Sequence, residues 1–154
     1  MKSLLAALML LLTPGLAAAQ DFTVVGLDGK SKTLTAAQMA DMPRESVKLG
    51  GGKTYEGPVL AYVLREVGAP AGAKLHGPAM RTYVVVRAKD GFAAVLSLAE
   101  TDKAFSNGLA ILADKVGGQP LSDRDGPYRL VVDGDLKGSR SVWGAVSAEL
   151  KAAQ

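Results

Sequence analysis

The chain has 154 residues, a formal net charge of +3 and no cysteine. Its basic residues are too few and too scattered for nucleic-acid binding, which needs a clustered basic surface. The lack of cysteine excludes disulfides, thiolate metal ligands and a cysteine nucleophile.

The first 19 residues have the pattern of a secretory signal peptide. Lys2 provides the charged start, and Leu4–Leu12 is an apolar run too short to span a bilayer. Ala17–Ala19 supplies the small residues that signal peptidase requires, although a membrane anchor is the alternative interpretation. We therefore expect cleavage after Ala19 and a single domain over residues 20–154. It would be periplasmic or secreted, with no membrane attachment after cleavage.

The domain opens with a predicted hairpin and a short helix. Phe22–Leu27 and Lys32–Leu34 are strand patterns on either side of a glycine turn. Thr35 and Gln38 have the spacing of a capping box, which predicts a helix that ends before Pro43.

A run of glycines follows the next predicted strand, Val47–Leu49. Gly50–Gly52 resembles a phosphate-binding loop, but the pattern predicts no helix directly after it, so a hairpin tip is favoured. The helix with the clearest pattern is predicted to begin at Gly57-Pro58 and to end at Gly68. Its apolar stripe consists of Val59, Leu60, Val63, Leu64 and Val67.

Strands dominate the middle of the chain. Thr82–Ala88 and Phe92–Leu98 flank a Lys-Asp-Gly turn, which is a strong hairpin signal. Ser97 and Glu100 have capping-box spacing and predict a short helical turn. Leu109–Ala113 predicts a further buried strand.

The C-terminal stretch places a basic loop between two buried strands. A predicted loop at Gly117–Pro120 leads to a chain reversal at Gly126-Pro127. Tyr128–Val132 and Val142–Leu150 are the predicted strands, and Leu136–Ser141 is the loop between them. Such a scaffold holds a loop still for binding.

Lys137 and Arg140 concentrate positive charge in this loop. A guanidinium and free backbone N–H groups hold anions well, so the loop is a candidate anion-binding site, with a solvated loop as the alternative. Trp143, the only tryptophan, is expected to be half-buried with its N–H hydrogen-bonded, or else to stack on a ligand.

The histidine and methionine residues do not form a recognisable catalytic site. His76 is the only histidine and lies in a Gly/Pro-rich loop without a nucleophile motif nearby, so we expect it to be exposed or packed. A copper(I) site formed by His76 with Met80, Met39 and Met42 is the alternative.

The acidic residues give no clear site either. Four aspartates resemble a calcium cluster only in number, and solvated turns are favoured; they are Asp123, Asp125, Asp133 and Asp135. Glu100 and Asp102 are two positions apart and would not face each other on a helix. We therefore predict no catalytic and no metal-binding residue.

Short helices mixed with strands, without a regular βαβ repeat, predict an α+β fold. The segments GKTYEGPVLAYVLREVGAP, TYVVVRAKDGFAAVLSLAE, LAILADKVGGQPL and DGPYRLVVDGDLKGSRSVWGAVSAEL follow one another in this order. Together they resemble the molybdopterin-binding oxidoreductase domain of the sulfite oxidase superfamily, in a short exported version spanning about Phe22 to Leu150. The resemblance implies a mixed sheet with short helices and a cofactor cleft lined by loops at strand ends.

Two departures from the family's pattern concern its cofactor. The cysteine that binds molybdenum in the family is expected near Val47–Gly51, but the chain has none, and Ser46 is the nearest substitute. The lysine that the family carries after its last arginine is replaced at Trp143. By the resemblance, the residues that line any surviving pocket are Lys137, Ser139, Arg140 and Ser141.

From these observations we expect a non-catalytic module without a bound cofactor. Its ligand would be an anionic small molecule, a pterin or a partner protein, and not nucleic acid. The alternative is a molybdopterin-dependent oxidoreductase, or a subunit of one, that binds the cofactor without a protein thiolate.

Overall fold

Residues 20–154, which the computed structural model describes, form two β-sheets accompanied by two short α-helices. This mixed architecture confirms the predicted α+β fold class. The predicted signal peptide lies outside the described residues. None of the helices within residues 20–154 is long and apolar enough to cross a membrane.

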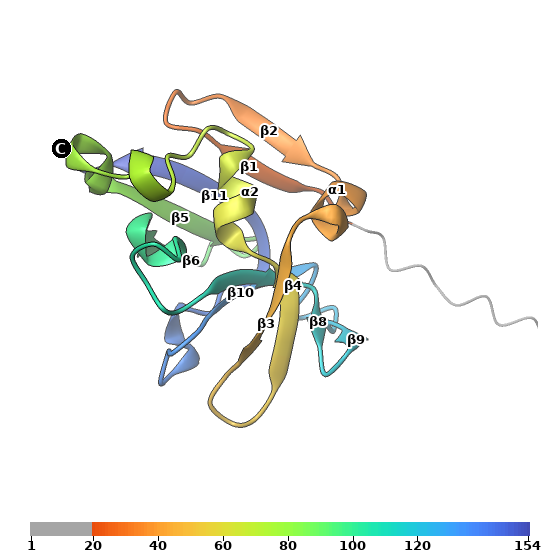
Figure 1. The fold of residues 1–154 in the computed structure, drawn as a ribbon. Helices are drawn as coiled ribbons and strands as arrows, with labels where there is room; N and C mark the ends of the chain where they lie inside the picture. Colours follow the sequence, from red (N-terminus) through yellow and green to blue (C-terminus); the bar gives the residue numbers. More distant parts are fainter. Residues whose placement is uncertain (1–19) are drawn as a thin grey trace, which may run out of the picture.

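The larger sheet is organised around β11 (Trp143–Ala152), the longest strand in the described part of the chain (Figure 1). Along one edge β11 pairs antiparallel with β5 (Thr82–Ala88). Opposite β5, the start of β11 pairs with β10 (Tyr128–Val132), and its later part pairs parallel with β1 (Phe22–Val25). The remaining strands of this sheet are β2 (Ser31–Leu34) beside β1, β6 (Ala93–Ser97) beside β5, and β7 (Ala110–Ala113) beside β10.

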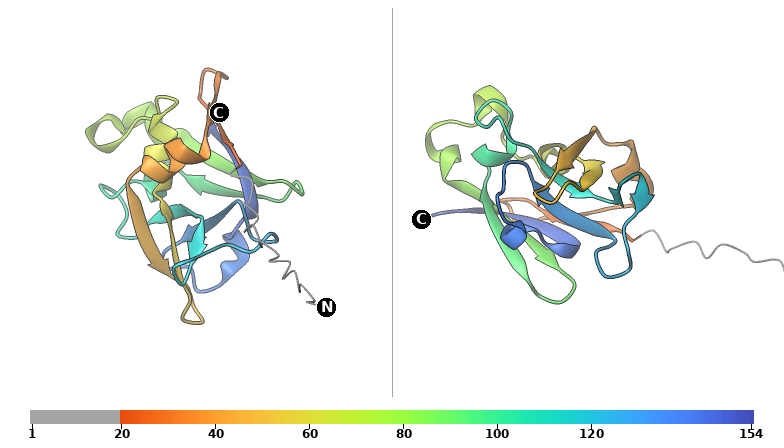
Figure 2. Two further views of the ribbon diagram at one scale, coloured as in Figure 1. Left: turned by 90° about the vertical axis from the view of Figure 1, so that its right-hand side faces the viewer. Right: turned by 90° about the horizontal axis from the view of Figure 1, so that it is seen from below.

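The smaller sheet is an antiparallel arrangement of four strands. Its strands, in spatial order, are β3 (Arg44–Lys48), β4 (Thr54–Pro58), β8 (Lys115–Val116) and β9 (Gln119–Pro120). The β3–β4 hairpin projects from the body of the molecule, as the views in Figures 1 and 2 agree. Its glycine-rich tip is therefore free to form one wall of a surface pocket.

Two apolar clusters hold these elements together. The larger one joins the strands of the main sheet to α1 (Ala36–Asp41) and α2 (Leu60–Arg65), and the α2 side chains Leu60, Val63 and Leu64 are fully buried in it. The smaller cluster joins the two sheets and consists of Val47, Tyr55, Val59, Ile111, Ala113 and Val131. The β3–β4 hairpin is thus anchored at its base.

Several local predictions are confirmed. Thr35 is the N-cap of α1 and exchanges both capping-box hydrogen bonds with Gln38. Ser97 and Glu100 likewise exchange reciprocal bonds at the short 3₁₀ turn after β6. Gly50–Gly52 forms a hairpin tip, because β3 and β4 pair directly on either side of it. These features depend on residues close in sequence, which is why the spacing alone predicted them.

Two predictions about element boundaries are wrong. α2 begins at Leu60 and not at Gly57-Pro58, because Gly57 and Pro58 complete the β3–β4 ladder opposite Glu45 and Arg44. The stretch Gly117–Pro120 is part of the β8–β9 hairpin and not a plain loop. In both cases the pairing of two strands, β3 with β4 and β8 with β9, outweighs the local preference of glycine and proline for turns.

Gly57 lies where the backbones of β4 and β7 approach most closely. A Cβ atom at this position would be 2.2 Å from the carbonyl oxygen of Leu112 and 2.5 Å from Cα of Ala113. Both are backbone atoms of a buried strand, so they cannot move aside as a flexible side chain can. Only glycine fits here.

We predict that Gly57→Ala lowers the free energy of unfolding by about 3 kcal/mol or more, because the clash forces β4 away from β7. Chemical denaturation measures the loss. Gly50→Ala is the matched control on the same hairpin, since its Cβ would meet the Leu136 carbonyl oxygen at an ordinary 3.8 Å. Equal stability of the two variants would contradict the close approach of the strands.

Candidate functional site

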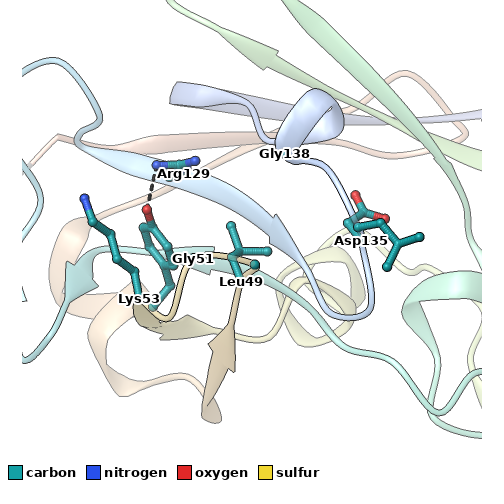
Figure 3. A pocket seen from close by; sticks show the side chains of 9 residues that line it. Leu49, Gly51, Lys53, Arg129, Asp135 and Gly138 are labelled. Carbon is teal, nitrogen blue, oxygen red and sulfur yellow. Dashed lines mark hydrogen bonds between the residues drawn. The ribbon is translucent and has the colours of Figure 1, made fainter.

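A cavity of about 280 Å³ lies between the tip of the β3–β4 hairpin, β10 and the loop that follows β10 (Figure 3). The hairpin contributes backbone at Gly50 and Gly51 and side chains at Leu49, Lys53 and Tyr55. Arg129 comes from β10, and the loop contributes Asp135, Leu136 and Gly138. The positive φ angle of Gly51, 101°, permits the sharp tip that brings the hairpin to the loop.

Arg129 is the central side chain of this pocket. It is only 8% exposed although it carries a full charge, and it lies in an otherwise apolar strand. Its Nη1 donates to the Tyr55 hydroxyl at 2.8 Å and lies 3.4 Å from Oδ2 of Asp125. Its Nε donates at 2.7 Å to Oγ of Ser141, which in turn donates to the Leu130 carbonyl oxygen. The guanidinium is therefore fixed in orientation.

Aromatic rings pack against the same guanidinium. Its central carbon lies 4.7 Å from the centroid of the Tyr55 ring and 4.8 Å from that of Trp143. The guanidinium of Arg124 lies 4.5 Å from the Trp143 ring as well. Cation–π contacts of this kind stabilise a desolvated guanidinium and leave only its edges for hydrogen bonding.

The pocket keeps two cationic donors available for a ligand. Within residues 20–154, no side chain or carbonyl accepts a hydrogen bond from Nη2 of Arg129. In the same part of the chain, Lys53 forms no side-chain hydrogen bond or ion pair. Both groups line the cavity, and Figure 3 shows them at the same end of it.

Arg140, by contrast, is already paired with two carboxylates. Its Nη2 donates to Asp135 at 2.7 Å and its Nη1 to Glu100 at 3.0 Å, while Nε makes a longer bond to Asp135 at 3.3 Å. These bonds, first those to Asp135 and then that to Glu100, raise the pKa of Arg140 above its ordinary value. The loop is thereby tied to the turn after β6.

The Glu100 carboxylate responds to the same contact. Partial burial by itself would raise its pKa, but hydrogen bonds from Arg140 and from the Ser97 backbone N–H outweigh this effect and hold the pKa below its ordinary value. Glu100 is thus a counterion of Arg140. Asp102 accepts hydrogen bonds from the backbone N–H groups of Gly72 and Ala104, which lower its pKa too.

Of the four residues predicted to line the pocket, two contact side chains of the pocket and two do not line it. Ser141 supports Arg129 directly, and Arg140 pairs with the pocket residue Asp135. Lys137 and Ser139 are exposed on the loop and do not line the cavity. A ligand-binding role for these four residues stays a prediction. The sequence analysis did not identify Arg129 as a site residue. A lone arginine within an apolar strand could have indicated a polar site, because a buried arginine nearly always has polar partners.

The other candidate residues have ordinary environments. His76 is exposed, as predicted. Trp143 is 38% exposed, and within residues 20–154 its indole N–H forms no hydrogen bond to a protein group, so a partner for this N–H stays a prediction. The ring is held by cation–π contacts instead. Asp125 and Asp135 pair with arginines, and within the described residues no three His, Cys, Asp or Glu side chains form a group that could hold a metal ion.

The fold and this pocket define an α+β domain with a small polar cavity at the tip of a projecting hairpin. No protein-family model and no curated protein sequence matches the chain. Among solved structures, the chain is similar to the sulfane dehydrogenase SoxCD from Paracoccus pantotrophus, with a TM-score of 0.58 and 18% sequence identity. The alignment covers 87% of this chain but only 39% of the SoxCD chain. The likeness supports a sulfite-oxidase-like fold.

The pocket residues do not fit the molybdenum cofactor of that superfamily. The segment expected to carry the thiolate reaches the pocket, but there it presents Leu49 and the glycines. Ser46 is exposed on β3 and does not line the cavity. A volume of about 280 Å³ is at the lower limit for drug-sized ligands, and a pterin with its phosphate arm needs more room.

We predict that Glu100→Gln lowers the free energy of unfolding by up to about 1 kcal/mol near neutral pH, because the ion pair with Arg140 is partly exposed. The pKa of Glu100 is lowered on folding, so this stabilisation is complete above its ordinary value of 4.5 and is lost as the pH falls through the lower folded-state pKa. Denaturation of both proteins at about pH 7 and about pH 3 tests this. A difference that is the same at both pH values would show that packing, and not charge, is responsible.

Proposed function

We propose that this chain is an exported, non-catalytic domain that binds a small anionic molecule in the pocket beside Arg129. The observation that carries the proposal is a buried, rigidly held guanidinium whose Nη2 is available, next to the ammonium of Lys53, which has no partner within residues 20–154. Charge-assisted hydrogen bonds from such donors are about twice as strong as neutral ones. Among the described residues, the lining contains no serine, threonine, cysteine or histidine.

In this proposal the loop residues support the site and do not form it. Arg140 holds the loop in place through Asp135 and Glu100, and Ser141 orients Arg129. Lys137 is exposed nearby and attracts anions from solution. The proposal therefore moves the main ligand contacts from Arg140 to Arg129 and Lys53.

Calorimetry with sulfate and phosphate at low ionic strength tests this assignment. We predict that Lys53→Gln weakens binding about tenfold, since one charge-assisted contact is lost. Lys74→Gln, which removes an exposed lysine outside the pocket, should leave the affinity within about twofold. Arg140→Gln, which leaves both proposed ligand contacts in place but removes a support of the loop, should weaken binding less than Lys53→Gln does. If Arg140→Gln weakens binding and Lys53→Gln does not, the sequence-based assignment to Arg140 is the correct one.

The second candidate is a molybdopterin-dependent oxidoreductase, or a subunit of one, that binds the cofactor without a protein thiolate. The fold likeness to a dehydrogenase favours it, since the chain is similar over most of its length to part of SoxCD. The small size of the pocket, and the leucine and glycines that it presents where a metal ligand is expected, argue against this function. A shared fold by itself does not carry an activity with it.

We predict that protein produced with its natural leader in a molybdenum-sufficient bacterial cell carries neither molybdenum nor pterin. Elemental mass spectrometry and a fluorescence assay for oxidised pterin measure both. The intact mass of the same periplasmic sample shows whether cleavage lies between Ala19 and Gln20, as the small-residue pattern requires. Near-stoichiometric molybdenum and pterin would overturn the binding-module proposal in favour of the oxidoreductase.

A further inference from the structure

The charged groups that line the pocket are separated by sign. Figure 3 shows the side chains of Lys53 and Arg129 at one end and that of Asp135 at the other, with the apolar side chain of Leu49 between them. Asp135 pairs with Arg140 of its own loop, and it also lines the cavity. Its carboxylate therefore gives the pocket a position of negative charge at the end opposite its two cations.

Both ends have capacity for a ligand. At the cationic end, Nη2 of Arg129 and Nζ of Lys53 are available as donors. At the anionic end, the two Asp135 oxygens accept one hydrogen bond each, both from Arg140. An ionised carboxylate has about four lone-pair sites, so further acceptor positions remain on Asp135. Its side chain is 17% exposed and lines the cavity.

The charged side chains that line the pocket carry both signs. Arg129 and Lys53 are the cations among them, and Asp135 is the carboxylate. A ligand that has both an acid group and an ammonium group can contact both kinds of charge, whereas an anion or a cation alone contacts only one kind.

We propose that the ligand is a small zwitterion with a carboxylate or sulfonate at one end and an ammonium group at the other. This inference rests on the proposed function, because the anionic group binds where that function places it, and it adds a cationic group to the ligand. The acid group binds Arg129 and Lys53, the ammonium binds Asp135, and a short aliphatic linker packs on Leu49. The volume of about 280 Å³ suits a linker of a few carbons and excludes a nucleotide.

The test is calorimetry on the mature protein with ω-amino acids from glycine to 6-aminohexanoate. Each is compared with the n-alkanoate of the same length, which lacks the ammonium, and with the matching alkylamine, which lacks the carboxylate. We predict that at least one ω-amino acid binds about tenfold more tightly than either counterpart, because it gains one further charge-assisted contact.

Asp135→Asn should abolish this advantage while the alkanoate still binds. Asp133→Asn is the matched control, since Asp133 is exposed on the same turn and does not line the pocket. Lys53→Gln should weaken the ω-amino acid and the alkanoate alike. Thermal unfolding checks that the variants fold. If Asp135→Asn does not fold, the comparison of ω-amino acids with alkanoates and alkylamines on the unmodified protein tests the zwitterion proposal.

The outcomes separate the two proposals. If alkanoates and sulfate bind in a Lys53-dependent way but no ω-amino acid binds more tightly than its alkanoate, the zwitterion inference is wrong and the anion-binding function stands. If ω-amino acids, alkanoates, sulfate and phosphate all fail to bind, the proposed function itself is wrong.

Discussion

The burial of the Arg129 guanidinium is the constraint on which the functional end of this molecule depends. A desolvated charge is costly unless its hydrogen bonds are satisfied, and here the partners come from several elements. Tyr55 belongs to the smaller sheet, Ser141 to the loop before β11, and Asp125 to the turn before β10. Because the Arg129 side chain contacts all three partners, the positions of the hairpin, of β10 and of the loop depend on one another.

A second set of ion pairs fixes the loop after β10. Arg140 is engaged by Asp135 and Glu100, so its charge stabilises the position of the loop against the turn after β6. Arg129 and Lys53, in contrast, line the hairpin end of the cavity. Residues that look alike in the sequence therefore have different environments in the fold.

The likeness to SoxCD concerns the fold and extends over less than half of that chain. Within this shared architecture, the hairpin tip carries Leu49 and glycines where the sulfite oxidase pattern calls for a thiolate. A scaffold that holds loops at strand ends can present a different set of groups without a change in its strand order. A small polar pocket that suits a small charged ligand is one such use.

The sequence by itself determined the features that depend on neighbours in the chain. The capping boxes at Thr35 and Ser97, the hairpin between β5 and β6, and the α+β class follow from spacing and local propensity. Tertiary structure alone decided that Gly57-Pro58 ends a strand. The two residues pair with β3, and Gly57 packs against the backbone of β7, which is distant in sequence. It also decided which arginine is free to bind a ligand. Lys137, Arg129 and Arg140 carry the same charge in the sequence. Only folding places Asp135 and Glu100 beside Arg140 and aromatic rings beside Arg129.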